Sequence, residues 1–212
     1  MNYLEQIFKE STNNNDFFTG YYNYLYELCK KLDNVTINEV INCFITAREN
    51  KRTIFFAGNG GSAATASHFA QDLSEVGRKA NVTGFKTISL TDNVSFLTAV
   101  GNDYGYEKIF SIQLAELFCK GDVLVVISAS GNSPNVIEAV KYAQENGGIT
   151  IGLVGFDGGK LLKMCDYVVH VAADKGEYGP VEDIHMILDH MITSFLIFNL
   201  MNGKLKTVWI IK

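Results

Sequence analysis

A glycine-rich turn followed by two titratable side chains is the part of the sequence best suited to chemistry. The turn lies in Ala57–Asp72, AGNGGSAATASHFAQD, directly after the apolar run Thr53–Phe56. Its glycines, Gly58, Gly60 and Gly61, permit positive φ and let backbone N–H groups crowd around a ligand. Ser62 stands where an N-cap belongs, before a helix predicted to run to about Val76. Such a helix N-terminus predicts an anion site, most naturally for a phosphate.

His68 and Asp72 lie four residues apart on that predicted helix, so they share one face beyond the anion site. A phosphate site with a titratable pair beside it predicts chemistry on a phosphorylated small molecule. The pattern is neither a Walker A motif nor GxGxxG, and a glycine turn by itself is more often a plain connection.

A second loop carries hydroxyl groups. Ser128–Asn135, SASGNSPN, follows the apolar run Val123–Ile127 and precedes another predicted helix. Hydroxyl and backbone donors at that place suit the oxygens of a phosphate monoester, although a capped serine-rich turn explains the pattern equally well. The polar residues of Gly101–Asp103 follow another strand and a short helix, and can face the same crevice.

The last predicted helix runs from near Pro180 past Leu196 and mixes titratable with apolar side chains. Its polar members are Glu182, Asp183, His185, Asp189 and His190. Such groups are costly to bury unless they are paired or bind a ligand. Helical spacing alone pairs His185 with Asp189 and brings Asp183 near His190, which is the structural alternative to a functional site.

The elements that position these residues alternate from residue 51 onward. Apolar runs predict strands, and amphipathic stretches between them predict helices, which together imply a doubly wound α/β fold with a five-stranded parallel sheet. Ligands of such folds bind beyond the carboxyl ends of the strands. The predicted strands are Thr53–Ala57, Thr87–Leu90, Val123–Ser128, Ile149–Val154 and Tyr167–Val171, and the helices between them are Ser62–Val76, Val94–Val100, Tyr106–Phe118 and Asn135–Asn146.

Residues 1–50 read as helices, with breaks at Ser11–Asp16 and near Asn34. We expect this N-terminal helical segment to belong to the same domain as residues 51–212. Its aromatic side chains, including four tyrosines between Phe17 and Leu32, are expected to pack on the core or on another subunit.

Composition excludes several classes of function. The chain has 212 residues and a net charge of −5, which argues against a nucleic-acid partner or an anionic membrane surface. Four scattered cysteines without a CxxC pattern indicate reduced thiols. No signal peptide and no run of membrane-spanning length is recognised, so we expect a cytoplasmic protein.

Four motifs taken together resemble one family. GNGGS with a helical H-F-A-x-(acidic), then GND-(aromatic)-G-(aromatic), S-x-SGNS-x-N and E-D-I-H-x-x-x-x-H look like the sugar isomerase (SIS) fold, and within it like phosphoheptose isomerase. The similarity covers about Lys51–Leu196. It implies a homotetramer that converts sedoheptulose 7-phosphate to D-glycero-D-manno-heptose 7-phosphate, with zinc at the site, in lipopolysaccharide or capsule synthesis.

The resemblance also implies roles for individual residues. General base and acid would be Asp72 and His190, and the metal ligands would be His68, Asp72, Glu182 and His190, a reasonable zinc set. The substrate contacts would fall on Asn59, Gly60, Gly61, Ser62, Asp72, Asn102, Asp103, Ser128, Ala129, Ser130, Ser133 and Glu182.

Two positions depart from the family pattern. The family has glutamate where this chain has Asp72, and glutamine where it has Glu182. The aspartate is one methylene shorter, which matters for a base that must reach a substrate proton, whereas Glu182 keeps a ligating oxygen and adds a negative charge.

Two alternatives to this activity stay open at the level of sequence. One is a related isomerase acting on a different phosphorylated sugar. The other is a non-catalytic SIS module that binds a sugar phosphate or a partner protein. Retention of all four titratable groups favours catalysis over loss of activity.

Overall fold

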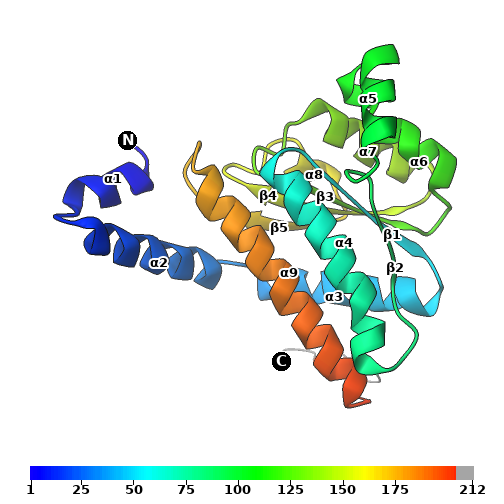
Figure 1. The fold of residues 1–212 in the computed structure, drawn as a ribbon, viewed down its shortest axis with the longest axis horizontal. Helices are drawn as coiled ribbons and strands as arrows, with labels where there is room; N and C mark the ends of the chain where they lie inside the picture. Colours follow the sequence, from blue (N-terminus) through cyan, green and yellow to red (C-terminus); the bar gives the residue numbers. More distant parts are fainter. Residues whose placement is uncertain (204–212) are drawn as a thin grey trace.

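The computed structural model describes residues 1–203, and their strands form an open parallel sheet (Figure 1). The strand order is β2-β1-β3-β4-β5, and every adjacent pair is parallel. The strands are β1 Thr53–Gly58, β2 Lys86–Ser89, β3 Val123–Ser128, β4 Ile149–Gly155 and β5 Tyr167–Val171. The predicted five-stranded doubly wound fold is therefore confirmed, with strand boundaries that differ by a residue at most.

Helices cover both faces of the sheet. One face carries α3 (Asn34–Glu49), α4 (Gly61–Ala80) and α9 (Tyr178–Met201), and the other carries α5 (Val94–Asp103), η1 (Tyr106–Lys108), α6 (Ser111–Leu117), α7 (Pro134–Glu145) and α8 (Leu161–Met164). Successive side chains along each strand point to opposite faces of the sheet. In β1, Ile54 and Phe56 pack under α3 and α4, whereas Phe55 and Ala57 pack under the second layer. This burial on both faces explains the unbroken apolar runs in the sequence.

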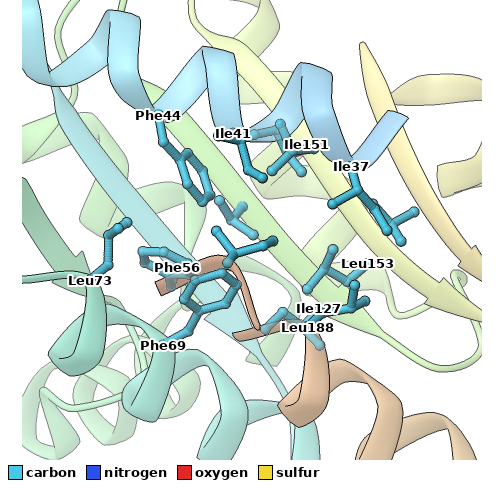
Figure 2. Close-up of a cluster of buried hydrophobic side chains, with 14 of the residues drawn as sticks. Ile37, Ile41, Phe44, Phe56, Phe69, Leu73, Ile127, Ile151, Leu153 and Leu188 are labelled. Carbon is cyan, nitrogen blue, oxygen red and sulfur yellow. The ribbon is translucent and has the colours of Figure 1, made fainter. Parts of the chain in front are cut away.

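The larger of the two cores lies between the sheet and the helices α3, α4 and α9 (Figure 2). Phe44 of α3, Phe56 of β1 and Phe69 of α4 pack ring against ring, with centroid distances of 5.0 to 6.5 Å. All three are at most 1% exposed. Leu188 of α9 joins the same cluster, so the core fixes α4 and α9 on one face of the sheet.

Three local predictions were wrong. The predicted helix at Tyr106–Phe118 is divided into η1 and α6, and Gly101–Asp103 forms the last turn of α5 rather than a loop. Ser62 is not the N-cap of α4. Gly60 occupies that position with φ of +56°, so the reversal of the chain is completed before Ser62, which is already inside the helix and buried.

The N-terminal helices α1 (Tyr3–Glu10) and α2 (Asn14–Lys30) extend to one side of the body in Figure 1. Two tyrosines attach α2 to the α9 region: Tyr21 donates to Asp183 and Tyr24 donates to Glu177, each at 2.5 Å. Tyr24 is buried, as expected for core packing, whereas Tyr22 and Tyr26 are exposed. The predicted division into residues 1–50 and 51–212 stays a prediction, and its segment 204–212 lies outside the described residues.

The helix α9 is, within residues 1–203, the one helix whose length and composition would suffice to cross a membrane. Half of its most apolar window is buried inside the protein. It packs beside α4 over the sheet (Figure 1), which is the position of a core helix in an α/β domain.

A histidine of α9 is enclosed in this core. His185 is 0% exposed, and its Nε2 lies 3.4 Å from the carbonyl oxygen of Val154 at the end of β4. Within the described part of the chain its Nδ1 has no hydrogen-bond partner. Burial lowers the pKa of His185 to about 4, so the imidazole is neutral in the fold at pH 7. The expected pairing of His185 with Asp189 is wrong.

We predict that His185 makes the fold sensitive to acid. The unfolded chain binds a proton at His185 near pH 6.5, whereas the folded chain resists it until about pH 4, so stability is lost as pH falls between these values. Compared with His185→Gln, the wild type should lose on the order of 2–3 kcal/mol more unfolding free energy between pH 7.5 and 4.5.

Urea unfolding at the two pH values measures this difference. His170→Gln is the control, because His170 also bonds a carbonyl oxygen, that of Phe156, but is only partly buried. Parallel pH profiles for the wild type and His185→Gln would contradict the prediction.

Candidate active site

A polar cavity of about 140 Å³ opens beyond the carboxyl ends of β1 and β3. These strands are neighbours, but the chain proceeds from β1 to β2 on one side and from β3 to β4 on the other. Their loops therefore diverge and leave a crevice at the switch point of the sheet, where ligands of open α/β folds bind. The lining residues are Asn59, Ser62, Ile127, Ser128, Ala129, Ser130, Ser133, Tyr178 and Glu182.

Two asparagines join the loops on either side of the crevice. The Nδ2 of Asn59 donates to Oδ1 of Asn135 at 2.9 Å, and the Nδ2 of Asn135 donates to Oδ1 of Asn59 at 2.8 Å. Tyr106 also donates its hydroxyl to Oδ1 of Asn59, at 3.0 Å. Asn135 is 1% exposed and Asn59 is partly buried, so this reciprocal amide pair, the asparagine clasp, joins the β1 loop to the start of α7.

The cavity offers neutral donors. The hydroxyls of Ser128 and Ser133 lie 3.4 Å apart, and α7 begins with Pro134 directly after Ser133. The helix α4 begins on the opposite wall, next to Ser62. Within residues 1–203 no lysine or arginine lines the cavity, so the positive ends of the two helices and the hydroxyl groups are what an anion would meet.

A cluster of titratable side chains lies further along α4 and α9. His68, Asp72, Asp189 and His190 each offer one ligand atom, and these atoms lie within 4.8 Å of one another. Nδ1 of His68 is 2.7 Å from Oδ2 of Asp189 and 3.9 Å from Oδ2 of Asp72. The rings of His68 and His190 meet edge to face at 5.1 Å.

Asp189 is the buried member of this cluster. It is 0% exposed, and burial raises the pKa of its carboxyl to about 6, although its hydrogen bond to His68 acts in the opposite direction. Its bond to His68 of α4 replaces the pairing with His185 that helical spacing suggests.

Glu182 lies apart from this cluster. It lines the cavity, and its carboxylate is packed so closely against Gly61 that a β carbon there would overlap Oε2 of Glu182. Burial, followed by the charge of Asp183, raises the pKa of Glu182. Three of the four expected metal ligands therefore lie together, and the fourth faces the polar cavity of the same chain.

The spacing of these contacts shows that α4 and α9 run in parallel. Gly61 of α4 touches Glu182 of α9, and seven residues later in both helices His68 bonds Asp189. Seven residues are two helical turns, a rise of roughly 10 Å. The two helices thus share one wall, with the polar cavity at its upper end and the titratable cluster two turns below.

Comparison with known proteins shows the family of this chain. The family model described as the SIS domain matches residues 18–155. The phosphoheptose isomerase of Aliarcobacter butzleri (strain RM4018) is 44% identical over 149 residues, which are 70% of this chain and 77% of that protein. The structure of the phosphoheptose isomerase GmhA from Neisseria gonorrhoeae is 36% identical, with a TM-score of 0.75 over 84% of this chain and 94% of its own. The chain belongs to the SIS-domain phosphoheptose isomerase family.

A phosphoheptose isomerase from Francisella tularensis has the same fold over most of both chains. It is 29% identical, with a TM-score of 0.77 over 92% of this chain and 98% of its own. The SIS family match itself begins in α2, so part of the N-terminal helical segment lies within the matched region.

Several predicted substrate residues of this phosphoheptose isomerase family member lie outside the cavity lining. Gly60 is the N-cap of α4 and Gly61 is its first residue. Asn102 and Asp103 lie in the last turn of α5, where Nδ2 of Asn102 donates to Oδ1 of Asp103 at 2.7 Å, and Asp103 is exposed. Their contacts with substrate stay predictions. Tyr178 was not predicted, because an isolated tyrosine at a helix start carries no signal of a binding site.

The asparagine clasp should control affinity for phosphate groups. We predict that Asn59→Ala and Asn135→Ala each weaken binding of a sugar phosphate, because either substitution lets the two loops separate. The double variant should be little worse than either single one, with a coupling energy of about 0.5–3 kcal/mol, as found for residues in contact.

Isothermal titration of the four proteins with sedoheptulose 7-phosphate measures this cycle. Asn146→Ala is a suitable control, since Asn146 caps the far end of α7 and its side-chain amide donates to the carbonyl oxygen of Tyr142, away from the cavity. If the losses of binding free energy from the two substitutions add up in the double variant, the two amides act separately and the prediction is contradicted.

Proposed function

We propose that this protein converts sedoheptulose 7-phosphate to D-glycero-D-manno-heptose 7-phosphate through an enediol. Membership of the phosphoheptose isomerase family supports an aldose–ketose isomerase. The arrangement of the site supports the same reaction independently, because it combines a polar cavity for a phosphate with a titratable cluster for proton transfer.

The observation that carries the proposal is the separation of these two parts. Seven residues of α4 and of α9 span the distance from the Gly61–Glu182 contact to the His68–Asp189 contact, which is roughly 10 Å. Six carbon–carbon bonds of about 1.5 Å separate C1 from C7 in an extended heptose, a span of roughly 8 Å to which the phosphate adds its own length. A C7 phosphate in the cavity therefore allows C1 and C2 to reach the cluster.

The cavity holds the phosphate and so orients the sugar. The hydroxyls of Ser128, Ser130 and Ser133 and the first turn of α4 at Ser62 are its donors. Binding energy spent on a phosphate remote from the reacting carbons places C1 and C2 in a reactive geometry. Glu182 lines the same cavity and, as a carboxylate, accepts hydrogen bonds from sugar hydroxyls.

Proton transfer falls to Asp72 and His190. A proton on carbon next to a carbonyl is weakly acidic, so the reaction needs a positioned base and stabilisation of the growing oxyanion. Asp72 takes the proton from C1 of the ketose and returns it to C2 of the enediol. His190 moves the second proton from the C1 hydroxyl to the oxygen on C2, so the proton balance closes without any redox partner.

The cluster fits a divalent cation such as zinc. It combines imidazole with carboxylate ligands, and a buried carboxylate oxygen of Asp189 is left without a partner in residues 1–203. His68, Asp72 and His190 would hold the ion. A bound cation would supply Lewis-acid polarisation of the substrate's paired oxygens.

A homotetramer in the cytoplasm completes the proposal. Exposed aromatic residues on α1 and α2 support contacts between subunits, since Phe8 is 70%, Tyr22 68% and Tyr26 64% exposed. The product would enter heptose synthesis for lipopolysaccharide or capsule. No nucleic acid and no membrane is among the proposed partners.

Substitution of the proton-transfer pair tests the reaction. We predict that Asp72→Asn and His190→Gln each lower kcat at least about 100-fold, within the range typical of general acid–base groups, with a smaller effect on substrate affinity. NMR in D₂O follows both the appearance of the aldose and the loss of the C1 proton.

His170→Gln serves as the control here also, because His170 lies on β5 and bonds Phe156. Unchanged turnover in Asp72→Asn would contradict the assignment of Asp72 as the base. Absence of aldose in the wild type with zinc present would contradict the proposed function itself.

A further inference from the structure

Asp189 is a buried carboxylate whose environment in residues 1–203 leaves it incompletely satisfied. Its Oδ2 is bonded to Nδ1 of His68 at 2.7 Å, while its Oδ1 is buried and has no hydrogen-bond partner. A buried polar atom without a partner costs about 1–3 kcal/mol, and more when it is charged. Burial of the whole side chain needs a compensating interaction that His68 alone does not supply.

A structural ion pair is an insufficient explanation. His68 is 41% exposed at its side chain, whereas Asp189 is fully buried, so one partner remains hydrated while the other is not. Replacing a buried pair of this kind by apolar residues is often neutral or stabilising. The Asp189 carboxylate belongs to a group of four side chains whose ligand atoms lie within 4.8 Å of one another, and one of its oxygens is unpaired within residues 1–203. This is the arrangement expected around a cation.

The grouping of the ligand atoms favours Asp189 over Glu182 as a ligand of the cation. His68, Asp72, Asp189 and His190 form one group with ligand atoms within 4.8 Å, and Glu182 is not a member. Glu182 is held two helical turns away, against Gly61. Two imidazoles and two carboxylates are ligands that zinc and similar divalent metals bind, and zinc can expand to five coordinates when a substrate oxygen binds as well.

We propose that Asp189 is the fourth protein ligand of the cation site in this chain, and that Glu182 belongs to the sugar-binding part of the active site. The proposal rests on the proposed function only in placing the cation at that active site. Metal binding is measured without substrate, so its outcome is separate from that of the isomerase assay.

Zinc binding by a matched pair of variants tests the assignment. Wild type, Asp189→Asn and Glu182→Gln are prepared as full chains, stripped with a chelator, and titrated with Zn²⁺ against a chromophoric competitor. Asp189→Asn should weaken zinc affinity by more than the roughly 10–100-fold that loss of a partner outside the coordination shell costs. Glu182→Gln should bind zinc within a few-fold of wild type.

The visible spectrum of the Co²⁺-loaded proteins separates a ligand from a residue that only orients His68. At saturating Co²⁺ the ligand-field bands should change in Asp189→Asn and stay the same in Glu182→Gln. Asp189→Ala provides the same two readouts if the asparagine variant does not fold, and circular dichroism of each metal-free protein checks that the fold is kept.

Two results would overturn the proposal. One is wild-type zinc affinity, or an unchanged Co²⁺ spectrum, in a folded Asp189 variant. The other is loss of zinc from Glu182→Gln comparable with that from Asp189→Asn, which would make Glu182 a ligand.

Discussion

The parallel packing of α4 on α9 is the constraint on which the site depends. Both helices start at the carboxyl edge of the sheet, and the aromatic core under them fixes their separation (Figure 2). Contacts between them recur after seven residues, first at Gly61 and Glu182 and then at His68 and Asp189. Gly61 makes the close approach possible, because a β carbon there would overlap the carboxylate of Glu182. Polar groups far apart in sequence are thereby brought to one wall.

Charge is distributed unevenly along this wall. The described lining of the cavity has hydroxyl, amide and backbone donors but no basic side chain, so it relies on helix N-termini for its positive potential. Glu182 at its lower edge is acidic, and burial raises its pKa. The cluster below has two carboxylates and two imidazoles. An anion therefore suits the helix N-termini and hydroxyl groups of the cavity better than the cluster, and a cation suits the cluster better, which favours one orientation of a phosphosugar.

Much of the fold follows from local patterns in the sequence. A strand buried on both faces must be almost continuously apolar, so the run at Val123–Ser128 marks the fully buried β3 to the residue. The predicted bounds of the edge strand β5, Tyr167–Val171, also agree with the structure. The glycine turn and the serine loop follow adjacent strands, which is why sequence reasoning finds both walls of the cavity. The N-cap prediction for Ser62 was wrong because Gly60, with φ of +56°, reverses the chain two positions earlier.

Contacts between helices are harder to predict. Spacing along α9 predicts a contact between His185 and Asp189. In the folded chain, His185 instead contacts the carbonyl oxygen of Val154, and Asp189 is hydrogen-bonded to His68. An i, i+4 rule describes neighbours on one helix and contains no information about the next one. The sequence indicates the contact between Asp189 and His68 only when α4 and α9 are considered together. Asp189 follows Glu182 by seven residues, and His68 follows Gly61 by the same number.

The central claim is that one substrate spans the wall from cavity to cluster. Its most direct test is the dependence of kcat/KM on chain length, measured for the C5, C6 and C7 ketose phosphates under identical metal loading. A two-turn separation predicts that kcat/KM rises steeply to the C7 ketose 7-phosphate, with the losses for shorter sugars appearing mainly in kcat. Equal kcat/KM values for the three sugars, or a preference for the C5 compound, would contradict the account.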